Sequence, residues 1–555
     1  MNYIYNVLIL FALFLFLPPT LKGQSTNIYE ETDADGYLSE TEEFLPHLFP
    51  THPLRETRAV WLTTIGGLDW PRIKATDTAS RERQKAELVK ILDNYKKANI
   101  NTVIFQTRVR AAVVYPSKIE PWELCLTGVA GKDPGYDPLA FCIDECHKRG
   151  MELHAWVVCI PIGTTQRQSG YGSASLAKKH RELVKTAKGG EMFMIPGKPQ
   201  TADYIANICK EIAENYDIDG ISLDYIRYPE KSYNFSDDEF YPRSSGLSKT
   251  EWRRDNITRI VRAVHDAVKP MKPWVKLSSS PVGKYCDTHR YSAGGWNCYH
   301  AVYQDPRLWL RENYQDMLFP MMYFVGNNFY PFLFDWAENC YGHPIIPGLG
   351  IYFLDPREGR WQLNDVRAEM HTARHSGIGG IAFYRGEFLT NNVKGIYDAA
   401  CDEFFSYPAL TARMTWTADT VSPMPPAYIR YDKGKLFWAS SATNTSKSKH
   451  PHDYILYNVY GSNIYPVDVT KSENLIATNI RDTEYELVGR ALKVRHYAVT
   501  AIDRFGNESD ATQEDKPVIE PPKYINVPRL INRDADNSKA YKTNKKTGKK
   551  TVKKR

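Results

Sequence analysis

The chain of 555 residues lacks an ordered arrangement of cysteines. Its nine cysteines, an odd number, lie between Cys125 and Cys401 without a repeated C-x-x-C spacing. Disulfide-rich modules and zinc sites both use cysteines in regular pairs. The sequence therefore argues against a disulfide framework and against a zinc site. Because no other cluster of metal-ligand residues is evident, we expect neither a metal ion nor a cofactor.

A long hydrophobic run is also missing, and the one apolar run near the N-terminus is short. It covers residues 7–18, fewer than the ~20 that cross a bilayer, and a polar segment follows it, as in a secretory signal. We expect a signal peptide over residues 1–23, with an uncleaved N-terminal anchor as the alternative. Export to the periplasm or the cell surface of a bacterium would follow.

The body of the chain has no excess of positive charge. The net charge is +6, but residues 533–555 carry ten Lys or Arg and two Asp, so the remainder is slightly negative. Nucleic acid is therefore not an expected partner. The basic tail, residues 531–555, is poor in apolar residues and is predicted to be disordered. Contact with an anionic surface and a purely solubilising role are both open for it.

After a polar N-terminal arm, residues 24–53, short apolar runs alternate with amphipathic segments. The runs that predict strands are residues 58–63, 102–107, 152–158, 220–223, 275–280, 317–323, 345–352 and 378–384. Helices are predicted at 81–98, 138–149 and 202–215. Eight strands in this alternation predict an α/β fold, a (β/α)8 TIM barrel over residues 54–408. An open doubly wound sheet is disfavoured because no glycine-rich phosphate loop follows the first strand.

The pattern of apolar and polar residues changes beyond Pro408. A proline-rich linker at 422–426 precedes short alternating runs at 435–438, 453–460 and 496–502. They predict a small all-β, immunoglobulin-like sandwich over residues 420–515. Its early Trp438 and its final strand resemble a fibronectin type III module. Whether this part binds glycan or only braces the barrel stays open.

Asp224 is the strongest catalytic prediction. Active sites of (β/α)8 barrels lie at the carboxyl ends of the strands. Side chains alternate along a strand, so Asp224 shares a face with Gly220 and Ser222 while Ile221 and Leu223 face the helices. We expect Asp224 to point into the barrel mouth. The alternative is a structural ion pair with Arg227.

The same segment carries a family resemblance. It reads Asp217-x-Asp219-Gly220-Ile221-x-x-Asp224-Tyr225-Ile226-Arg227-Tyr228-Pro229 and resembles the signature of the glycosyl-hydrolase-like 10 family, bacterial exported barrels. Residues 55–61, 106–122, 126–139 and 147–156 agree with it, whereas the segments after the third and sixth strands depart from it. The resemblance implies a glycoside hydrolase acting on a bacterial cell-wall glycan such as peptidoglycan, or on another polysaccharide.

Glycoside hydrolysis normally uses two carboxylates. Glu387, after the eighth strand, is narrowly preferred as the second one over Glu120, Glu123 and Asp305. Position at strand ends or in mouth loops predicts a substrate-binding set of Gln106, Arg108, His154, Trp156, Arg227, Trp296, Tyr323 and Tyr352. For His154 and for each aromatic residue, a place in the barrel core is the alternative. A catalytically silent glycan-binding protein is the alternative function, and the oligomeric state is open.

Overall fold

The computed structural model describes residues 52–440 and 454–514. The predicted signal peptide, the basic tail and all but the last two residues of the predicted arm lie outside them. Within the described ranges, no helix has both the length and the apolar character needed to cross a membrane.

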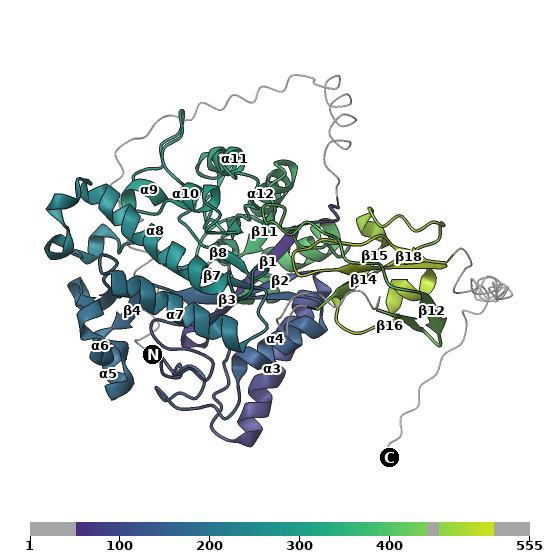
Figure 1. Ribbon diagram of the computed structural model, residues 1–555, viewed down its shortest axis with the longest axis horizontal. Helices are drawn as coiled ribbons and strands as arrows, with labels where there is room; N and C mark the ends of the chain where they lie inside the picture. The colour runs from purple at the N-terminus through teal and green to yellow at the C-terminus, as the bar shows by residue number, and fades with distance from the viewer. Residues whose placement is uncertain (1–51, 441–453, 515–555) are drawn as a thin grey trace, which may run out of the picture. The chain divides into compact units, whose positions relative to one another are not determined.

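Eight parallel strands form a sheet that closes into a barrel, and Figure 1 labels six of them, β1, β2, β3, β7, β8 and β11, in the middle of the fold. They are β1 (Thr57–Leu62), β2 (Thr102–Arg108), β3 (Glu152–Val158), β7 (Gly220–Asp224), β8 (Lys276–Ser279), β9 (Met317–Leu318), β10 (Gly348–Leu349) and β11 (Gly380–Phe383). Their order is β10-β11-β1-β2-β3-β7-β8-β9. Parallel bridges from Leu318 to Ile345 and from Met321 to Gly348 join the two ends of the sheet. The predicted (β/α)8 fold is confirmed.

Side-chain alternation along the strands creates two separate cores. One fills the barrel interior and includes Trp61, Trp156 and Phe319. The other lies between the sheet and the surrounding helices and includes Ile221 and Leu223 of β7. Since these two residues face the helices, Asp224 at the end of the same strand faces the interior, as the alternation predicts.

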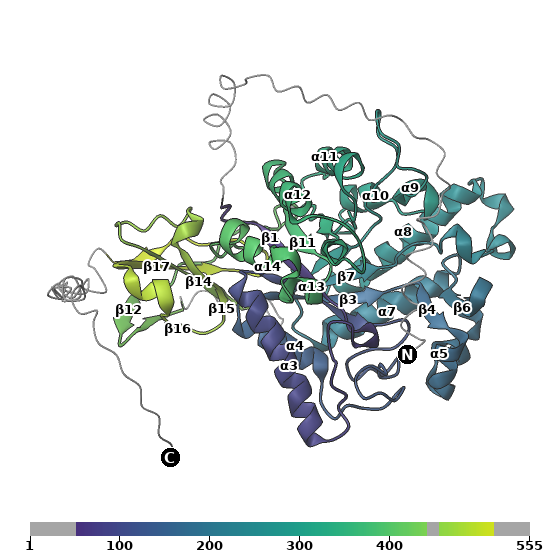
Figure 2. The ribbon, with the colours of Figure 1, turned by 180° about the vertical axis from the view of Figure 1, so that it is seen from behind.

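Helices cover the outside of the barrel (Figure 2). The longer ones are α3 (Thr78–Lys97), α4 (Pro138–Lys148), α7 (Pro199–Asn215), α8 (Lys249–Val268), α11 (Tyr330–Glu338) and α12 (Leu363–His375). Local sequence explains where α4 starts and stops. The Asp137 carboxylate accepts a hydrogen bond from Ala140 N at 3.0 Å, and Gly150 just beyond the helix has a φ of 69°, which glycine adopts without strain.

An insertion between β3 and α7 was not anticipated from the sequence. It forms a three-stranded antiparallel sheet of β4 (Pro161–Thr164), β6 (Glu191–Met194) and β5 (Val184–Thr186), with the short helices α5 (Thr165–Gly170) and α6 (Leu176–Lys179). Strands of three or four residues are too short to show a recognisable alternation. Because the insertion follows the carboxyl end of β3, it lies on the mouth side of the barrel.

The C-terminal part consists of two antiparallel sheets, as predicted. One contains β12 (Ile429–Asp432), β13 (Lys435–Trp438) and β16 (Glu484–Glu486), and the other contains β15 (Leu475–Ile480), β14 (Leu456–Ser462), β17 (His496–Ile502) and β18 (Thr512–Gln513). They share a core that includes Trp438, Tyr457 and Val499. The more specific likeness to fibronectin type III stays a prediction.

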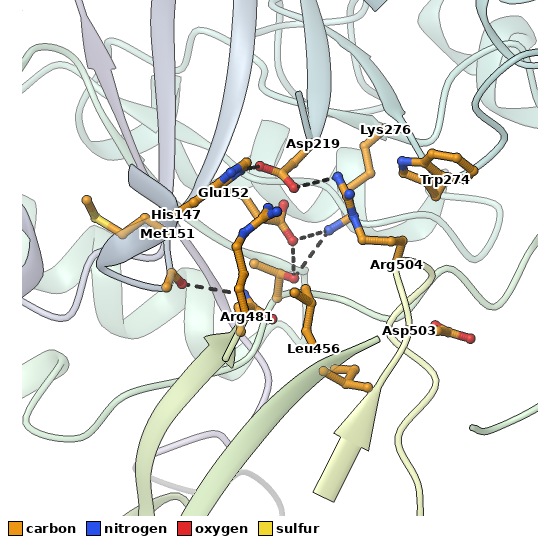
Figure 3. A pocket seen from close by; sticks show the side chains of 15 residues that line it. His147, Met151, Glu152, Asp219, Trp274, Lys276, Leu456, Arg481, Asp503 and Arg504 are labelled. Carbon is orange, nitrogen blue, oxygen red and sulfur yellow. Dashed lines mark hydrogen bonds and ion pairs between the residues drawn. The ribbon is translucent and has the colours of Figure 1, made fainter. Parts of the chain in front are cut away.

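These sheets are tied to the amino ends of the barrel strands, opposite the mouth. Asp217 and Asp219, which both precede β7, accept hydrogen bonds from Arg481 and Arg504 of the C-terminal part, at 2.8–2.9 Å. Figure 3 marks the hydrogen bond from the Arg504 guanidinium to Asp219 with a dashed line. We call Asp217, Asp219, His147, Arg481 and Arg504 the floor cluster. A cavity lined in part by His147, Asp219, Arg481 and Arg504 holds about 30 Å³, room for about one water molecule, and is too small for a saccharide.

Candidate active site

Asp224 lies at the carboxyl end of β7, beside the end of β3, where its register partner is Val158. Its side chain is buried and receives two hydrogen bonds. The indole Nε1 of Trp156 donates to Oδ2 at 3.0 Å, and the backbone N of Tyr225 donates to Oδ1 at 2.7 Å. The carboxyl group is therefore held in one orientation at the barrel mouth.

The environment of Asp224 favours its protonated form. Burial raises its pKa, and the positive charge of Arg227 together with the two hydrogen bonds offsets this only in part. A raised pKa is the direction of shift that suits a carboxylic acid to general acid catalysis. Trp156, predicted to bind substrate, is in this structure the residue that positions Asp224.

Arg227 lies next to Asp224 but forms its ion pair with Glu230. Its Nη2 is 3.2 Å from Glu230 Oε1, and its guanidinium stacks on the rings of Tyr225 at 4.4 Å and Trp296 at 5.9 Å. Only 6% of the residue is exposed. Thus the predicted neighbourhood of Arg227, Trp296 and Asp224 is present, although the direct Asp224–Arg227 ion pair is not. Glu230 went unnoticed in the sequence because nothing local marks it as a partner of Arg227.

Three tyrosines follow consecutive strands and form an aromatic wall at the mouth. Tyr323 and Tyr384 stack with ring centroids 5.2 Å apart, and Tyr352 meets both edge-on at 5.8 Å. Burial raises the pKa of all three hydroxyls, so they stay neutral. Flat rings with a polar edge are suited to sugar faces and hydroxyls. Tyr384 was missed, although it directly follows the apolar run of β11, a strand end like those before Tyr323 and Tyr352.

Glu387 belongs to a different network from Asp224. It is in the short helix α13 (Gly386–Thr390), and its carboxylate accepts from Arg72 Nη2 at 2.6 Å and from Arg385 Nη1 at 3.0 Å. Arg385 also pairs with Asp69 at 2.5 Å. The pKa of Asp224 is set by burial, by the charge of Arg227 and by hydrogen bonds from Tyr225 N and Trp156, and Glu387 is not among these influences. A catalytic role for Glu387 therefore stays a prediction, and its place in the structure does not strengthen it.

The other carboxylates considered from the sequence also have internal partners. Glu120 forms an ion pair with Arg108, and Glu123 forms one with Arg167. Asp305 accepts a hydrogen bond from the Tyr285 hydroxyl.

The predicted contact of Arg108 with substrate is not supported. Its side chain is 0% exposed; Nε and Nη2 donate to Glu120 at 2.9 and 2.6 Å, and Nη1 donates to the carbonyl oxygens of Val158 and Cys159. Cys159 N in turn donates to the Asp224 carbonyl oxygen at 2.8 Å. Arg108 therefore fixes the end of β3 beside Asp224 and does not face the mouth.

Gln106 and His154 are likewise turned to internal contacts. The Gln106 Oε1 accepts from the backbone N atoms of Thr64 and Ile65 at 2.9 and 2.8 Å, which orders the loop after β1. His154 is fully buried, pairs with Glu152 at 3.1 Å, and is the register partner of Gly220. That position is four residues below Asp224, roughly 13 Å along the strand. The alternative of a barrel-interior histidine describes His154 better than substrate binding.

No group of three or more His, Cys, Asp or Glu side chains that could hold a metal ion occurs in the ranges that the structure describes. The chemistry at the mouth is that of a buried carboxylic acid, a stacked guanidinium and aromatic rings.

Fold and site together define a class. A closed (β/α)8 barrel with a protonatable carboxyl group and an aromatic wall at the carboxyl ends of its strands is suited to glycoside hydrolysis. The chain matches the family model described as "Glycosyl hydrolase-like 10" over residues 56–346. It belongs to the glycosyl hydrolase-like 10 family, and its enzyme class is that of the glycoside hydrolases.

Two relatives extend the match. Glycosyl hydrolase YngK of Bacillus subtilis (strain 168) is 32% identical over 499 residues, which cover 83% of this chain and 93% of the relative. Glycosyl hydrolase DigH of Escherichia coli (strain K12) is 34% identical over 287 residues, 48% of this chain and 65% of that protein. Among solved structures, the PgaB (BpsB) glycoside hydrolase domain from Bordetella bronchiseptica matches with a TM-score of 0.42 at 13% identity, covering 63% of this chain and 99% of that one.

Proposed function

We propose that the protein is an exported glycoside hydrolase that cleaves a bacterial cell-wall glycan, such as the glycan strand of peptidoglycan, or another polysaccharide, with Asp224 as the general acid. The observation that carries this proposal is the buried Asp224 carboxyl group at the barrel mouth, which Trp156 and Tyr225 orient and whose pKa burial raises. The short apolar run at residues 7–18 supports export.

In the proposed mechanism, Asp224 donates its proton to the glycosidic oxygen as the bond to the anomeric carbon breaks. The leaving sugar departs as an alcohol, and positive charge develops on the remaining ring. The rings of Tyr323, Tyr352 and Tyr384 contact sugar faces, and their neutral hydroxyls hydrogen-bond to the substrate. The oxygen of a water molecule then bonds to the anomeric carbon, and the proton that this water loses returns to the Asp224 carboxylate.

The test is release of new reducing ends from purified peptidoglycan and from other microbial and plant polysaccharides. Wild type should release them on at least one substrate, and Asp224→Asn should be slower by about 10²–10⁴-fold, the range of a general acid. Asp144→Asn, an exposed Asp on α4, is the matched control and should act like wild type. Equal rates for Asp224→Asn and wild type would remove Asp224 from the mechanism. No release from any substrate would contradict the proposed activity.

A further inference from the structure

Arg227 is unusual among the buried arginines of this chain. Its Nε and Nη1 atoms are both buried and have no hydrogen-bond partner in the described ranges. The other arginines with a buried nitrogen of this kind leave one such atom each. A buried cationic donor without an acceptor is costly. Such a group at an enzyme's mouth indicates an acceptor that arrives with the ligand.

Two aromatic rings and one carboxylate surround the guanidinium of Arg227. Tyr225 and Trp296 stack against it at 4.4 and 5.9 Å, and Glu230 engages Nη2 at 3.2 Å. Stacked rings occupy the faces of a guanidinium and leave its edge for in-plane acceptors, for which oxyanions are the preferred partners. Nη2 donates to Glu230 within the protein, and the donors at Nε and Nη1 remain for a ligand.

A second cation lies on the same side of the mouth. Arg110, in the loop after β2, acts electrostatically on Tyr225, the ring on which Arg227 stacks. Within the described part of the chain, its guanidinium has neither an ion pair nor a hydrogen bond. Arg110, Ala111 and Tyr225 also have positive φ angles of 51°, 64° and 49°. Non-glycine residues adopt this conformation at a cost, and such residues cluster at ligand-binding sites.

We propose that Arg227, assisted by Arg110, forms a subsite for a carboxylate carried by the sugar bound next to Asp224, so that the preferred substrate is an acidic glycan. The inference rests on the mouth being the glycan site of the proposed function. Trp296 belongs to the irregular segment 286–297, in which Gly294 and Gly295 have φ angles of 68° and 75°. For a carboxylate to reach the buried nitrogens of Arg227, this segment has to move.

Binding of monosaccharide probes to the full chain tests the subsite without requiring hydrolysis. The probes are N-acetylmuramic acid, with its carboxylate on an ether side chain, and glucuronic acid, with its carboxylate on the ring, each compared with its neutral methyl amide by calorimetry or NMR titration. The acid form should bind at least about tenfold more tightly, the effect of a charged hydrogen bond. Whichever acid shows the larger ratio identifies the source of the carboxylate.

Two variants at the subsite should change the acid-to-amide ratio in opposite directions. Arg227→Gln should reduce it to about one, while Glu230→Gln, which removes the anion competing for Arg227, should increase it. Arg227→Lys, which keeps the charge but not the planar donors, should give an intermediate ratio. It also provides the test if Arg227→Gln does not fold. Equal binding of acid and amide by wild type, no binding of either, or an unchanged ratio in Arg227→Gln overturns the subsite.

The outcomes separate the two proposals. Hydrolysis of neutral and acidic glycans at equal rates, without discrimination in binding, would leave the glycosidase and remove the carboxylate subsite. Tighter binding of the acid than of its amide, without hydrolysis of any glycan, would leave the carboxylate subsite and remove the glycosidase.

Discussion

The two ends of the short strand β7 place the same type of side chain in opposite electrostatic environments. Asp219, beside the amino end, accepts from His147 Nε2 and Leu153 N at 2.8 Å and from Arg504 Nη2 at 2.9 Å. Burial alone would raise its pKa, but His147, Arg504 and Arg481 outweigh burial and hold the pKa of Asp219 well below its usual range. Asp224 has one nearby cation, and burial prevails, so its pKa is raised.

The comparison shows how one strand serves both architecture and chemistry. Full pairing at the floor cluster keeps Asp219 charged and ties the barrel to the C-terminal sheets. Incomplete pairing at the mouth leaves Asp224 able to gain and lose a proton and leaves donors of Arg227 without acceptors. Perturbed groups of the second kind are typical of functional sites, whereas fully satisfied networks are typical of structural ones.

The largest expected effect comes from neutralising the mouth carboxylate. Asp224→Asn should lower kcat by about 10²–10⁴-fold without lowering stability. The pKa of Asp224 in the folded state is raised, so its contribution to stability is present below the ordinary value of 3.8 and is lost as the pH rises through the folded-state pKa. Replacement by a neutral amide removes that loss at pH 7. Reducing-end assays and urea unfolding at pH 7 measure the two effects, and a large fall in stability would contradict the comparison.

The matching change at the floor should do the opposite. Asp219→Asn leaves Arg504 and His147 without a full counter-charge, which costs about 3–5 kcal/mol for a buried pair. The folded pKa is lowered, so the stability from Asp219 is present above 3.8 and is lost as the pH falls below it. Urea unfolding should therefore show a large difference from wild type at pH 7 that shrinks below pH 3.8. The activity of the folded fraction should persist, and a loss specific to kcat would place Asp219 in the chemistry.

The two ends of β7 also show how far the sequence could reach. Alternation along β7 predicted the direction of Asp224 because strand geometry is local. The family signature contains Asp217 and Asp219 as well as Asp224. Nothing in this pattern indicates that the first two belong to the floor cluster and that Asp224 lies at the barrel mouth. Arg481 and Arg504 lie more than 250 positions away from their carboxylate partners. For the same reason Arg108 was read as a substrate ligand, since its engagement by Glu120 and two carbonyls depends on the folded loop. Such pairings are set by tertiary structure.

A third buried acid sharpens the comparison because, unlike Asp219 and Asp224, it has neither a nearby cation nor a hydrogen-bond donor in the described ranges. Glu369 of α12 is fully buried, and in the described ranges neither carboxyl oxygen has a hydrogen bond. Burial, with a smaller contribution from Asp365, raises its pKa to about 9 from 4.5. Its stabilising contribution is thus complete below pH 4.5 and is lost as the pH rises toward 9. Glu369→Gln should be more stable by roughly 3 kcal/mol at pH 7.

Urea unfolding of Glu369→Gln and wild type between pH 5 and 9 checks this expectation. The difference should grow across the range, and exposed Glu338→Gln on α11 should show no such trend. A difference independent of pH would mean that Glu369 is not protonated in the folded protein.

The smallest effect concerns the hydrogen bond that distinguishes Asp224 from a simply buried acid. Trp156→Phe removes the indole donor to Oδ2, which stabilises the ionised form, so the pKa of Asp224 should rise by up to about one unit. Because a general acid must be protonated, the alkaline limb of the kcat/KM profile should move to higher pH. The matched control is Trp70→Phe, whose indole donates to the carbonyl oxygen of Gln84 at 3.0 Å, and its profile should not move. If both variants shift the limb equally, packing and not the hydrogen bond sets the proton affinity of Asp224.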